Sequence, residues 1–267
     1  MTRPRRGYTD GPFGQIHYQD TGGEGFPLVL CHQAPMTSRQ YDTVYPMLSA
    51  EGIRAIGIDT PGFGLSDEPN HVPSVEDYAT AIPPVLDHLG ITQTDILGHH
   101  TGGLIATEVA LQFPDRVRNL VINGPCPFTP EELLEWNAFV ENFEKNFEHK
   151  DDGSHLSEVF SRRWNWAEEG TDPALVTRYV VEQFQGYGPF WYGHNAAFTY
   201  DHNVTLPKIR HRTMILINTG DIIYEHAKRA HEMRPDFAFC ELQGGGVDIT
   251  DQMPKEWVAA VSDFLRG

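Results

Sequence analysis

Short, nearly all-apolar runs alternate along this chain with longer stretches whose apolar residues recur at helical spacing. This alternation is typical of a mostly parallel, twisted sheet flanked by helices, because strands that are buried on both faces are apolar throughout. The sequence therefore predicts an α/β fold. The predicted strands are Gln15–Gln19, Pro27–Cys31, Ile53–Ile58, Asp95–Leu97, Val117–Ile122, Thr213–Ile217 and Phe237–Leu242, and the predicted helices are Arg39–Ala50, Ser74–Leu89, Gly102–Phe113 and Glu256–Leu265.

The alternation stops between residues 129 and 207. This segment has no clear strand; it is first charged and then rich in aromatic residues. We interpret residues 129–207 as a helical cap inserted into a core of residues 1–128 and 208–267. We expect the cap over the carboxyl edge of the sheet, where open α/β sheets bind ligands. Aromatic walls suit apolar or aromatic ligands. The candidate substrate contacts in the cap are Trp164, Trp191, His194 and His202.

The charge and the cysteines limit the partners and the compartment. The 267 residues include 20 basic and 37 acidic ones, so the formal net charge is −17. That charge argues against nucleic acid and against an anionic membrane surface, since both attract clustered positive charge. No segment reaches the roughly 20 apolar residues that a membrane span requires. The three cysteines lack metal-ligand spacing and suit a reducing compartment, so we predict a cytoplasmic protein. A homodimer stays open.

Four segments, in chain order, carry a resemblance to a known family. They are His32-Gln-Ala-Pro35, Asp59-Thr-Pro-Gly-Phe-Gly-Leu-Ser-Asp67, Gly98-His-His-Thr-Gly-Gly103 and Gln243-Gly-Gly-Gly-Val-Asp248. Together they resemble the α/β-hydrolase fold family over nearly the whole chain, with residues 129–207 as the cap. The resemblance implies an elbow of the pattern G-x-S-x-G, a strained turn between strand and helix that exposes a nucleophile.

Two positions depart from the pattern of this family. His100 stands where the family has its nucleophile, and Val247 stands where it has its base histidine. Valine has no lone pair and accepts no proton. The resemblance places the acid of the family at Asp221, and Asp248 is a second carboxylate beside the altered position. The sequence therefore predicts a site without the usual Ser-His-acid triad, in which Asp221 or Asp248 orients His100.

The resemblance also implies an oxyanion site formed by the backbone N–H groups of Ala34 and Thr101. Gln33 replaces a glycine of the family, and we expect it to line the site together with His32 and Val247. In the family the residue at the His32 position usually braces its loop. No Gly-rich dinucleotide or phosphate loop is present, so we predict no cofactor.

An imidazole with an ordinary pKa of about 6.5 performs acid–base chemistry near neutral pH. We therefore expect His100 to act as a general base or acid on a small, mainly apolar or aromatic carbonyl compound. The reaction is hydrolysis of an ester, lactone or C–C bond, or a non-hydrolytic elimination, isomerisation or cyclisation. Acylation of His100 is less favoured, because nothing activates that ring as a nucleophile. We predict no metal site, because adjacent His99 and His100 are expected to point in different directions.

Two alternatives remain at this point. In one, Val247 records the loss of chemistry, and the chain is a ligand-binding pseudoenzyme of the same fold. In the other, the C-terminal alignment is shifted, and His226, near Asp221 in sequence, serves as the base. Apart from this alternative, we expect His226 to be a solvated residue on a surface helix.

Overall fold

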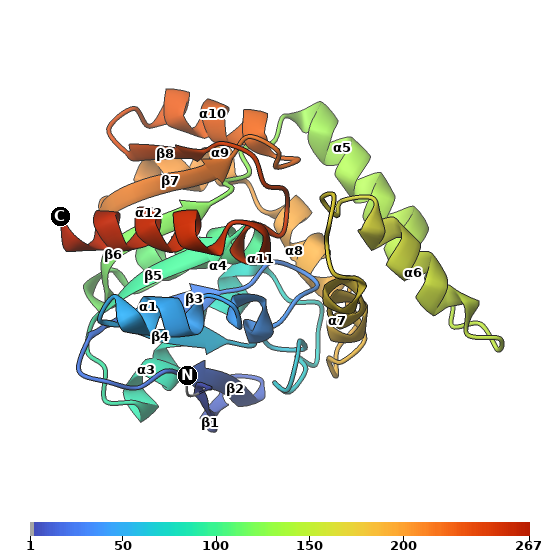
Figure 1. Cartoon of the computed structure of the whole chain (residues 1–267), viewed down its shortest axis with the longest axis horizontal. Helices are drawn as coiled ribbons and strands as arrows, with labels where there is room; N and C mark the ends of the chain where they lie inside the picture. Colours follow the sequence, from blue (N-terminus) through green and yellow to red (C-terminus); the bar gives the residue numbers. More distant parts are fainter. Residues whose placement is uncertain (1–2) are drawn as a thin grey trace.

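The computed structural model describes residues 3–267, so residues 1 and 2 of the predicted core lie outside the described residues. Its centre is an eight-stranded sheet with the order β1-β2-β4-β3-β5-β6-β7-β8 (Figure 1). β1 and β2 pair antiparallel at one edge, and every pair from β4 to β8 is parallel. The strands are β1 (Arg5–Gly11), β2 (Gly14–Asp20), β3 (Phe26–Cys31), β4 (Ile53–Ile58), β5 (Thr94–His99), β6 (Val117–Asn123), β7 (Arg212–Asn218) and β8 (Ala238–Leu242).

Helices cover both faces of the sheet, and each face has its own apolar core. Alternate residues of one strand enter different cores: Val29 packs with α2, α3, α4 and α10, whereas Leu30 packs with α1 and α12. This period of two is what the apolar runs predict for strands buried on both faces. The helices are α1 (Tyr45–Ala50), α2 (Val75–Ala79), α3 (Ile82–His88), α4 (Thr101–Gln112), α5 (Pro130–Phe139), α6 (Ser154–Trp164), α7 (Pro173–Gln183), α8 (Tyr192–Thr199), α9 (His202–Thr205), α10 (Tyr224–Met233), α11 (Ile249–Gln252) and α12 (Pro254–Arg266).

The α/β prediction is confirmed, with a few differences in the elements. All seven predicted strands are present. β1 was not predicted, because its residues are half or fully exposed and form no apolar run. The predicted helix 39–50 is a 3₁₀ turn followed by α1, which starts beside Pro46. The predicted helix 74–89 is likewise divided into α2 and α3, and Pro83 and Pro84 follow the break. Proline has no N–H to donate, so it is tolerated in the first turn of a new helix.

The segment 129–207, all of which the structure describes, contains helices and no strand. α5, α6 and α7 stand to one side of the sheet in Figure 1, and α8 lies between them and α4. Its treatment as a separate cap with boundaries at 129 and 207 stays a prediction. Within residues 3–267, none of the helices combines the length and the apolar character needed to cross a bilayer.

Candidate active site

The turn between β5 and α4 is strained. His100 lies between these elements with φ 48° and ψ −113°, and among residues 3–267 it alone has a positive φ without being glycine. The glycines around it are required by contact: a Cβ on Gly98 would lie 1.8 Å from the Gly102 carbonyl oxygen, and one on Gly102 would lie 2.1 Å from the Cys31 carbonyl oxygen. Such strain is characteristic of the exposed elbow that the sequence predicted.

The side chain of His100 reaches from this turn to Asp221, which follows β7. Nε2 of His100 lies 2.9 Å and 3.1 Å from the two carboxylate oxygens. Burial by itself would raise the pKa of Asp221, but the charge and the hydrogen bond of His100 hold that pKa well below its ordinary value. The carboxylate is therefore ionised and only accepts hydrogen bonds, so Nε2 of His100 carries the donated proton.

The other ring nitrogen of His100 is left for chemistry. Nδ1 makes no hydrogen bond to any described residue, and it is not fully buried. His100 lines a cavity, so this nitrogen is accessible from it. In a Ser-His-Asp triad a separate histidine lies between the elbow residue and the acid. Here the residue at the β5–α4 turn, His100, itself contacts the carboxylate of Asp221.

His99 also faces Asp221, which corrects the expectation that adjacent histidines point in different directions. Its Nε2 lies 4.0 Å from an oxygen of Asp221, and the two imidazole centroids are 4.3 Å apart. The expectation assumed the side-chain alternation of an extended strand, and the positive φ of His100 breaks that alternation. Burial and the nearby His100 lower the pKa of His99 to about 4, so this ring is neutral at neutral pH.

Gln40 determines which nitrogen of His99 is protonated. Its Oε1 accepts the Gln33 backbone N–H at 2.9 Å, so its Nε2 donates to Nδ1 of His99 at 2.6 Å. The proton of His99 therefore sits on Nε2, facing Asp221. His99, His100 and Asp221 bring their potential ligand atoms within 4.8 Å of one another, a donor set that suits zinc. However, a metal ion would need the lone pair of His99 Nε2, and the proton of the ring would then have to sit on Nδ1 and be donated to an acceptor. Gln40 instead donates to Nδ1, which keeps the proton on Nε2. These residues do not fit a metal ion.

A cavity of about 330 Å³ opens beside His100 at the carboxyl ends of β3, β5, β6 and β7. That is a volume typical of small-molecule sites. Its walls combine loops that follow the strands with side chains from α5 to α8. They are mostly apolar, with a few charged groups among them. The lining residues are Gln33, Ala34, Pro35, Met36, His100, Thr101, Cys126, Phe128, Trp136, Phe139, Glu144, Val159, Arg162, Arg163, Trp166, Tyr179, Val180, Gln183, His194, Ala197, Phe198, Ile222, Ile223 and Val247.

Comparison with known proteins agrees with this architecture. A family model described as alpha/beta hydrolase fold matches residues 27–221. The chain belongs to the alpha/beta hydrolase fold family. A solved structure of a hydrolase from Pseudomonas aeruginosa PA01 superposes on this alpha/beta hydrolase fold with a TM-score of 0.84 at 19% identity, covering 98% of this chain and 99% of that one.

Curated relatives match over a shorter segment. Haloalkane dehalogenase 2 of Mycobacterium bovis is 36% identical over 131 residues, which are 49% of this chain and 45% of the relative. A 2-hydroxy-6-oxononadienedioate/2-hydroxy-6-oxononatrienedioate hydrolase of Paraburkholderia phymatum is 35% identical over 125 residues, 43% of each chain. The match thus spans less than half the length of these curated relatives of the alpha/beta hydrolase fold family.

Several site residues expected from the family resemblance do line the cavity. They include Ala34 and Thr101, whose backbone N–H groups donate to no acceptor within residues 3–267. Both amides are therefore available to a ligand. The N–H of Thr101 opens α4, where the first turn leaves its donors free. The other expected residues found in the walls are Gln33, His194 and Val247.

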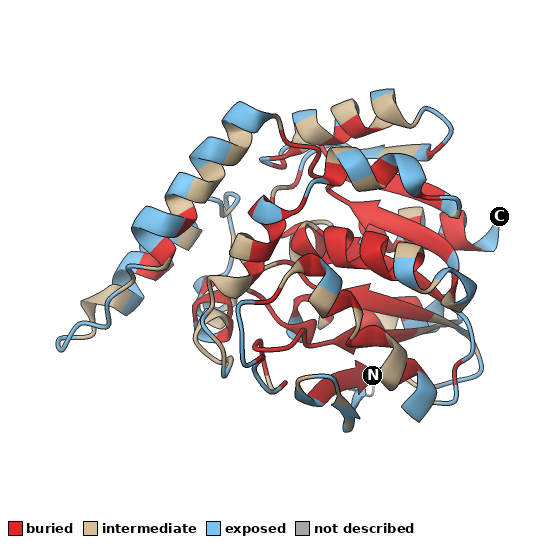
Figure 2. Ribbon diagram, turned by 180° about the vertical axis from the view of Figure 1, so that it is seen from behind, coloured by how far each residue is buried: buried red, intermediate tan, exposed pale blue. Residues whose placement is uncertain are grey.

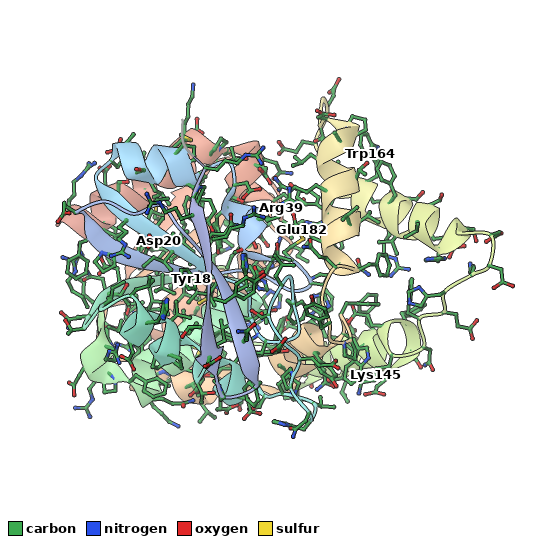
Figure 3. The ribbon with its side chains drawn as sticks, turned by 90° about the horizontal axis from the view of Figure 1, so that it is seen from below. Tyr18, Asp20, Arg39, Lys145, Trp164 and Glu182 are labelled. Carbon is green, nitrogen blue, oxygen red and sulfur yellow. The ribbon has the colours of Figure 1, made fainter. Side chains whose placement is uncertain are left out.

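Four predicted contacts do not reach the cavity. Trp164 is the last residue of α6 and stacks on Phe160 at the surface. Trp191 packs edge-on against Tyr192, with the Lys145 ammonium over its ring. Figure 3 labels Trp164 and Lys145 on the helices that stand away from the sheet.

The third is His32, whose two ring nitrogens are both used, one within its own loop and one toward the loop that follows β4. Its Nδ1 lies 2.9 Å from the Gln33 carbonyl oxygen, and its Nε2 accepts the Thr60 N–H at 3.1 Å. It braces the loop, which was the usual role that the family resemblance implied. His202 is also excluded from the cavity: it is buried, and its Nδ1 accepts the Cys126 N–H at 3.1 Å. Burial lowers the pKa of His202 to about 3.

Asp248 does not orient His100, contrary to one prediction. Its carboxylate is paired with Arg163 of α6, and it lies 3.5 Å from the Gln33 side-chain nitrogen. Burial raises the pKa of Asp248, whereas the Arg163 charge opposes that change. Sequence reasoning missed Arg163. The pairing across 85 residues left no local signal.

His226 is neither solvated nor a base for the site. Its side chain is 12% exposed, its Nε2 lies 3.3 Å from Glu132, and its ring packs edge-on against Phe128. The solvated reading is therefore wrong. The alternative that His226 serves as the base is also not supported, because the imidazole hydrogen-bonded to Asp221 is that of His100.

Proposed function

We propose that this chain is a cofactor-independent, serine-free enzyme of the alpha/beta hydrolase fold, in which His100 is the general base or acid. Its substrate is a small apolar or aromatic carbonyl compound bound under helices α5 to α8. The observation that carries the proposal is the 2.9 Å contact of His100 Nε2 with buried Asp221, which leaves Nδ1 accessible in the cavity. An oriented imidazole beside a cavity is what proton transfer to a bound substrate requires.

Asp221 has two functions in this proposal. It fixes the ring through Nε2, and its negative charge stabilises the imidazolium that forms when Nδ1 takes a proton. Its own orientation is fixed by the Ile223 backbone N–H, which donates to Oδ1 at 3.0 Å. A carboxylate that is buried, ionised and held from two sides needs little reorganisation during proton transfer.

The backbone N–H groups of Ala34 and Thr101 are the proposed oxyanion donors. Ala34 follows β3, and Thr101 opens α4 after β5. Because β3 and β5 are neighbours in the sheet, the two residues lie at adjacent positions of its carboxyl edge, and both line the cavity. Loss of one such donor typically raises a barrier by about 3 kcal/mol. With His100 as base, this arrangement supports addition of water to an ester, lactone or C–C substrate. It equally supports an enolate formed by removal of a proton next to the carbonyl.

The test uses two substitutions at the proposed dyad. His100→Ala and Asp221→Asn are assayed on a panel of aromatic esters, lactones and β-diketones, with product release followed by absorbance. We expect turnover to fall by about 10²–10⁴-fold in His100→Ala. His71→Ala is the matched control, because His71 also contacts a carboxylate, Asp77, but is exposed far from the cavity. Full turnover by His100→Ala on a compound that the unmodified chain converts would overturn the proposal.

A ligand-binding pseudoenzyme is the second candidate, and Val247 in the cavity wall is the observation that favours it. Calorimetry and product analysis on the same panel distinguish the two. Tight binding without product at every pH tested, with His100→Ala changing only the affinity, supports the pseudoenzyme.

A further inference from the structure

A second histidine–carboxylate pair lies in the same cavity. His194 of α8 contacts Glu144, the last residue of the π-helical segment Val140–Glu144, with 2.8 Å between Nδ1 and Oε1. Both residues line the cavity that His100 lines. Two imidazoles, each bound to a carboxylate, thus meet one cavity, His100 from the β5–α4 turn and His194 from the helical segment. The function proposed above uses only the first pair.

Glu144 is buried, and one of its two carboxylate oxygens has no partner within the described residues. The residue is 7% exposed, and the oxygen without a hydrogen-bond partner among residues 3–267 is Oε2. Trp136, Phe139 and Phe198 line the same cavity. An ionised carboxylate in apolar surroundings is costly unless a positive group accompanies it. His194 is the group in hydrogen-bond contact with Glu144.

The groups around His194 favour its protonated form on balance. Burial alone would lower the pKa of His194, but the charge and hydrogen bond of Glu144 raise it above the ordinary value, and the Ala34 carbonyl acts in the same direction. The guanidinium of Arg163, which also lines the cavity, opposes this effect. The ring is fixed by stacking on Phe198, with centroids 5.7 Å apart and planes at 17°.

We propose that His194, held by Glu144, is a second catalytic residue that binds and protonates the oxygen on which negative charge develops. This inference rests on the proposed function. Its location supports the role, because His194 lies against Ala34, whose N–H is one of the two proposed oxyanion donors. A cation at that point adds charge and a transferable proton to the neutral N–H groups of Ala34 and Thr101.

The proton inventory balances for ester hydrolysis. Nδ1 of His100 takes a proton from water, the hydroxide oxygen bonds to the carbonyl carbon, and the π electron pair moves to the carbonyl oxygen. That oxygen receives the proton on Nε2 of His194, whose Nδ1 contacts Glu144, so the tetrahedral adduct is neutral. On collapse, the adduct returns this proton to His194 while the C–O bond to the leaving group breaks. The leaving oxygen takes the proton from His100, and both rings regain their starting states.

The first test measures binding and needs no turnover. Benzoate and benzamide have the same shape but differ in charge, and their affinities are measured by calorimetry for the unmodified chain, His194→Gln and Glu144→Gln. We expect His194→Gln to weaken benzoate by about 10-fold or more and benzamide by less than about 3-fold. Glu144→Gln weakens benzoate in the same direction. His149→Gln, an exposed histidine that does not line the cavity, is the control and leaves both affinities unchanged.

Arg162 and Arg163 also line the cavity, so Arg162→Gln separates an arginine effect from a histidine effect. If Arg162→Gln removes the preference for benzoate while His194→Gln retains it, the inference is overturned. Equal loss of benzoate and benzamide in His194→Gln also overturns it, because that result describes packing alone.

The second test measures the protonation of the His194 ring directly. Nitrogen-15 NMR of labelled histidines is expected to show that His194 loses its proton at a higher pH than an ordinary imidazole, and at a lower pH in Glu144→Gln than in the unmodified chain. A His194 pKa at or below the ordinary imidazole value, or a titration unchanged by Glu144→Gln, contradicts the inference. On any ester that is turned over, His194→Gln lowers kcat more than it raises KM. The two proposals fail separately: full turnover by His100→Ala removes the proposed function, whereas unchanged kcat in His194→Gln removes only this inference.

Discussion

Two helices that meet at the cavity, α4 and α5, are held in different ways. α4 buries Thr101 to Ala110, ten of its twelve residues, whereas α5, described over its full length, has no buried residue. Figure 2 shows the same contrast, with the sheet and α4 mostly buried and the outlying helices mostly exposed or intermediate. The position of His100 is therefore fixed by close packing. The residues opposite it come from helices α5 to α8, which form an outer layer over the cavity and are less completely buried than α4.

Charged and hydroxyl groups tie this outer layer to the sheet. Arg163 pairs with Asp248, and Arg178 pairs with Asp251, which also accepts the Tyr179 hydroxyl at 2.8 Å. Glu182 of α7 accepts the Thr37 hydroxyl at 2.9 Å, and Figure 3 labels it beside Arg39 where the two layers meet. Such ties depend on pairing, since an unpaired buried charge is costly. We therefore expect the free energy of unfolding to depend mainly on side-chain volume for substitutions in the sheet and α4, and mainly on charge for substitutions in the outer layer.

The largest effect is expected at the elbow, from Gly98→Ala. The added Cβ would lie 1.8 Å from a backbone oxygen, so no side-chain rotation relieves the contact. We expect a loss of about 3 kcal/mol or more in the free energy of unfolding, measured by urea titration. Gly90→Ala is the control: its φ of 67° is unfavourable for alanine, but nothing lies within 4 Å of the new Cβ. It should cost about 1 kcal/mol. Equal losses in the two variants would contradict the packing argument.

The same contrast explains what could be predicted from the sequence. The strands and the elbow were predictable because apolar runs and the glycine spacing around His100 are local signals. The cavity side chains of the outer layer were not, because they depend on where a helix ends. Trp164 closes α6 and faces outward, whereas Trp166, two residues further, lies beyond that end and lines the cavity.

Pairing between distant segments also left no local signal. Asp221 and Asp248 were both candidates to orient His100, with Asp221 at the position of the family's acid, and only the fold shows that Arg163 pairs with Asp248. Glu144 was a member of an acidic run in the sequence, and its burial beside His194 follows from the packing of α8. The identity of the elbow was therefore readable, but its charged partners across the cavity were not.

The outer layer should respond to pH through Glu182. Burial raises the pKa of Glu182 to about 7, although Arg178 opposes this change. A carboxyl group whose pKa is raised in the folded state stabilises the fold at low pH. That contribution is lost as the pH rises from the ordinary carboxyl value through about 7. Glu182→Gln removes the titration and can still accept the Thr37 hydroxyl. It should gain up to about 3 kcal/mol over the unmodified chain at high pH, at about 1.4 kcal/mol per pKa unit.

Urea titrations at about pH 5 and about pH 8 measure this difference, since the ordinary carboxyl pKa lies below both values. Glu225→Gln is the control, because Glu225 is exposed and its carboxylate pairs with Lys228 on the same helix. If Glu182→Gln loses as much stability between the two pH values as the unmodified chain, the carboxyl of Glu182 is not the group responsible.

The smallest effect is expected on the outer face of α5, from Leu134→Ala. Leu134 is 72% exposed, so its truncation removes little buried apolar surface and should change the free energy of unfolding by less than about 0.5 kcal/mol. Leu104→Ala is the matched substitution in α4, where the side chain is fully buried, and it should cost about 2–5 kcal/mol. Urea unfolding of both variants compares the same change of volume in the two layers. A loss above about 1 kcal/mol in Leu134→Ala would show that α5 is packed in solution against a surface other than the one seen here. A small loss in both variants would instead mean that α4 tolerates a cavity, and the elbow would then be held by Gly98 and Gly102 rather than by the core beneath it.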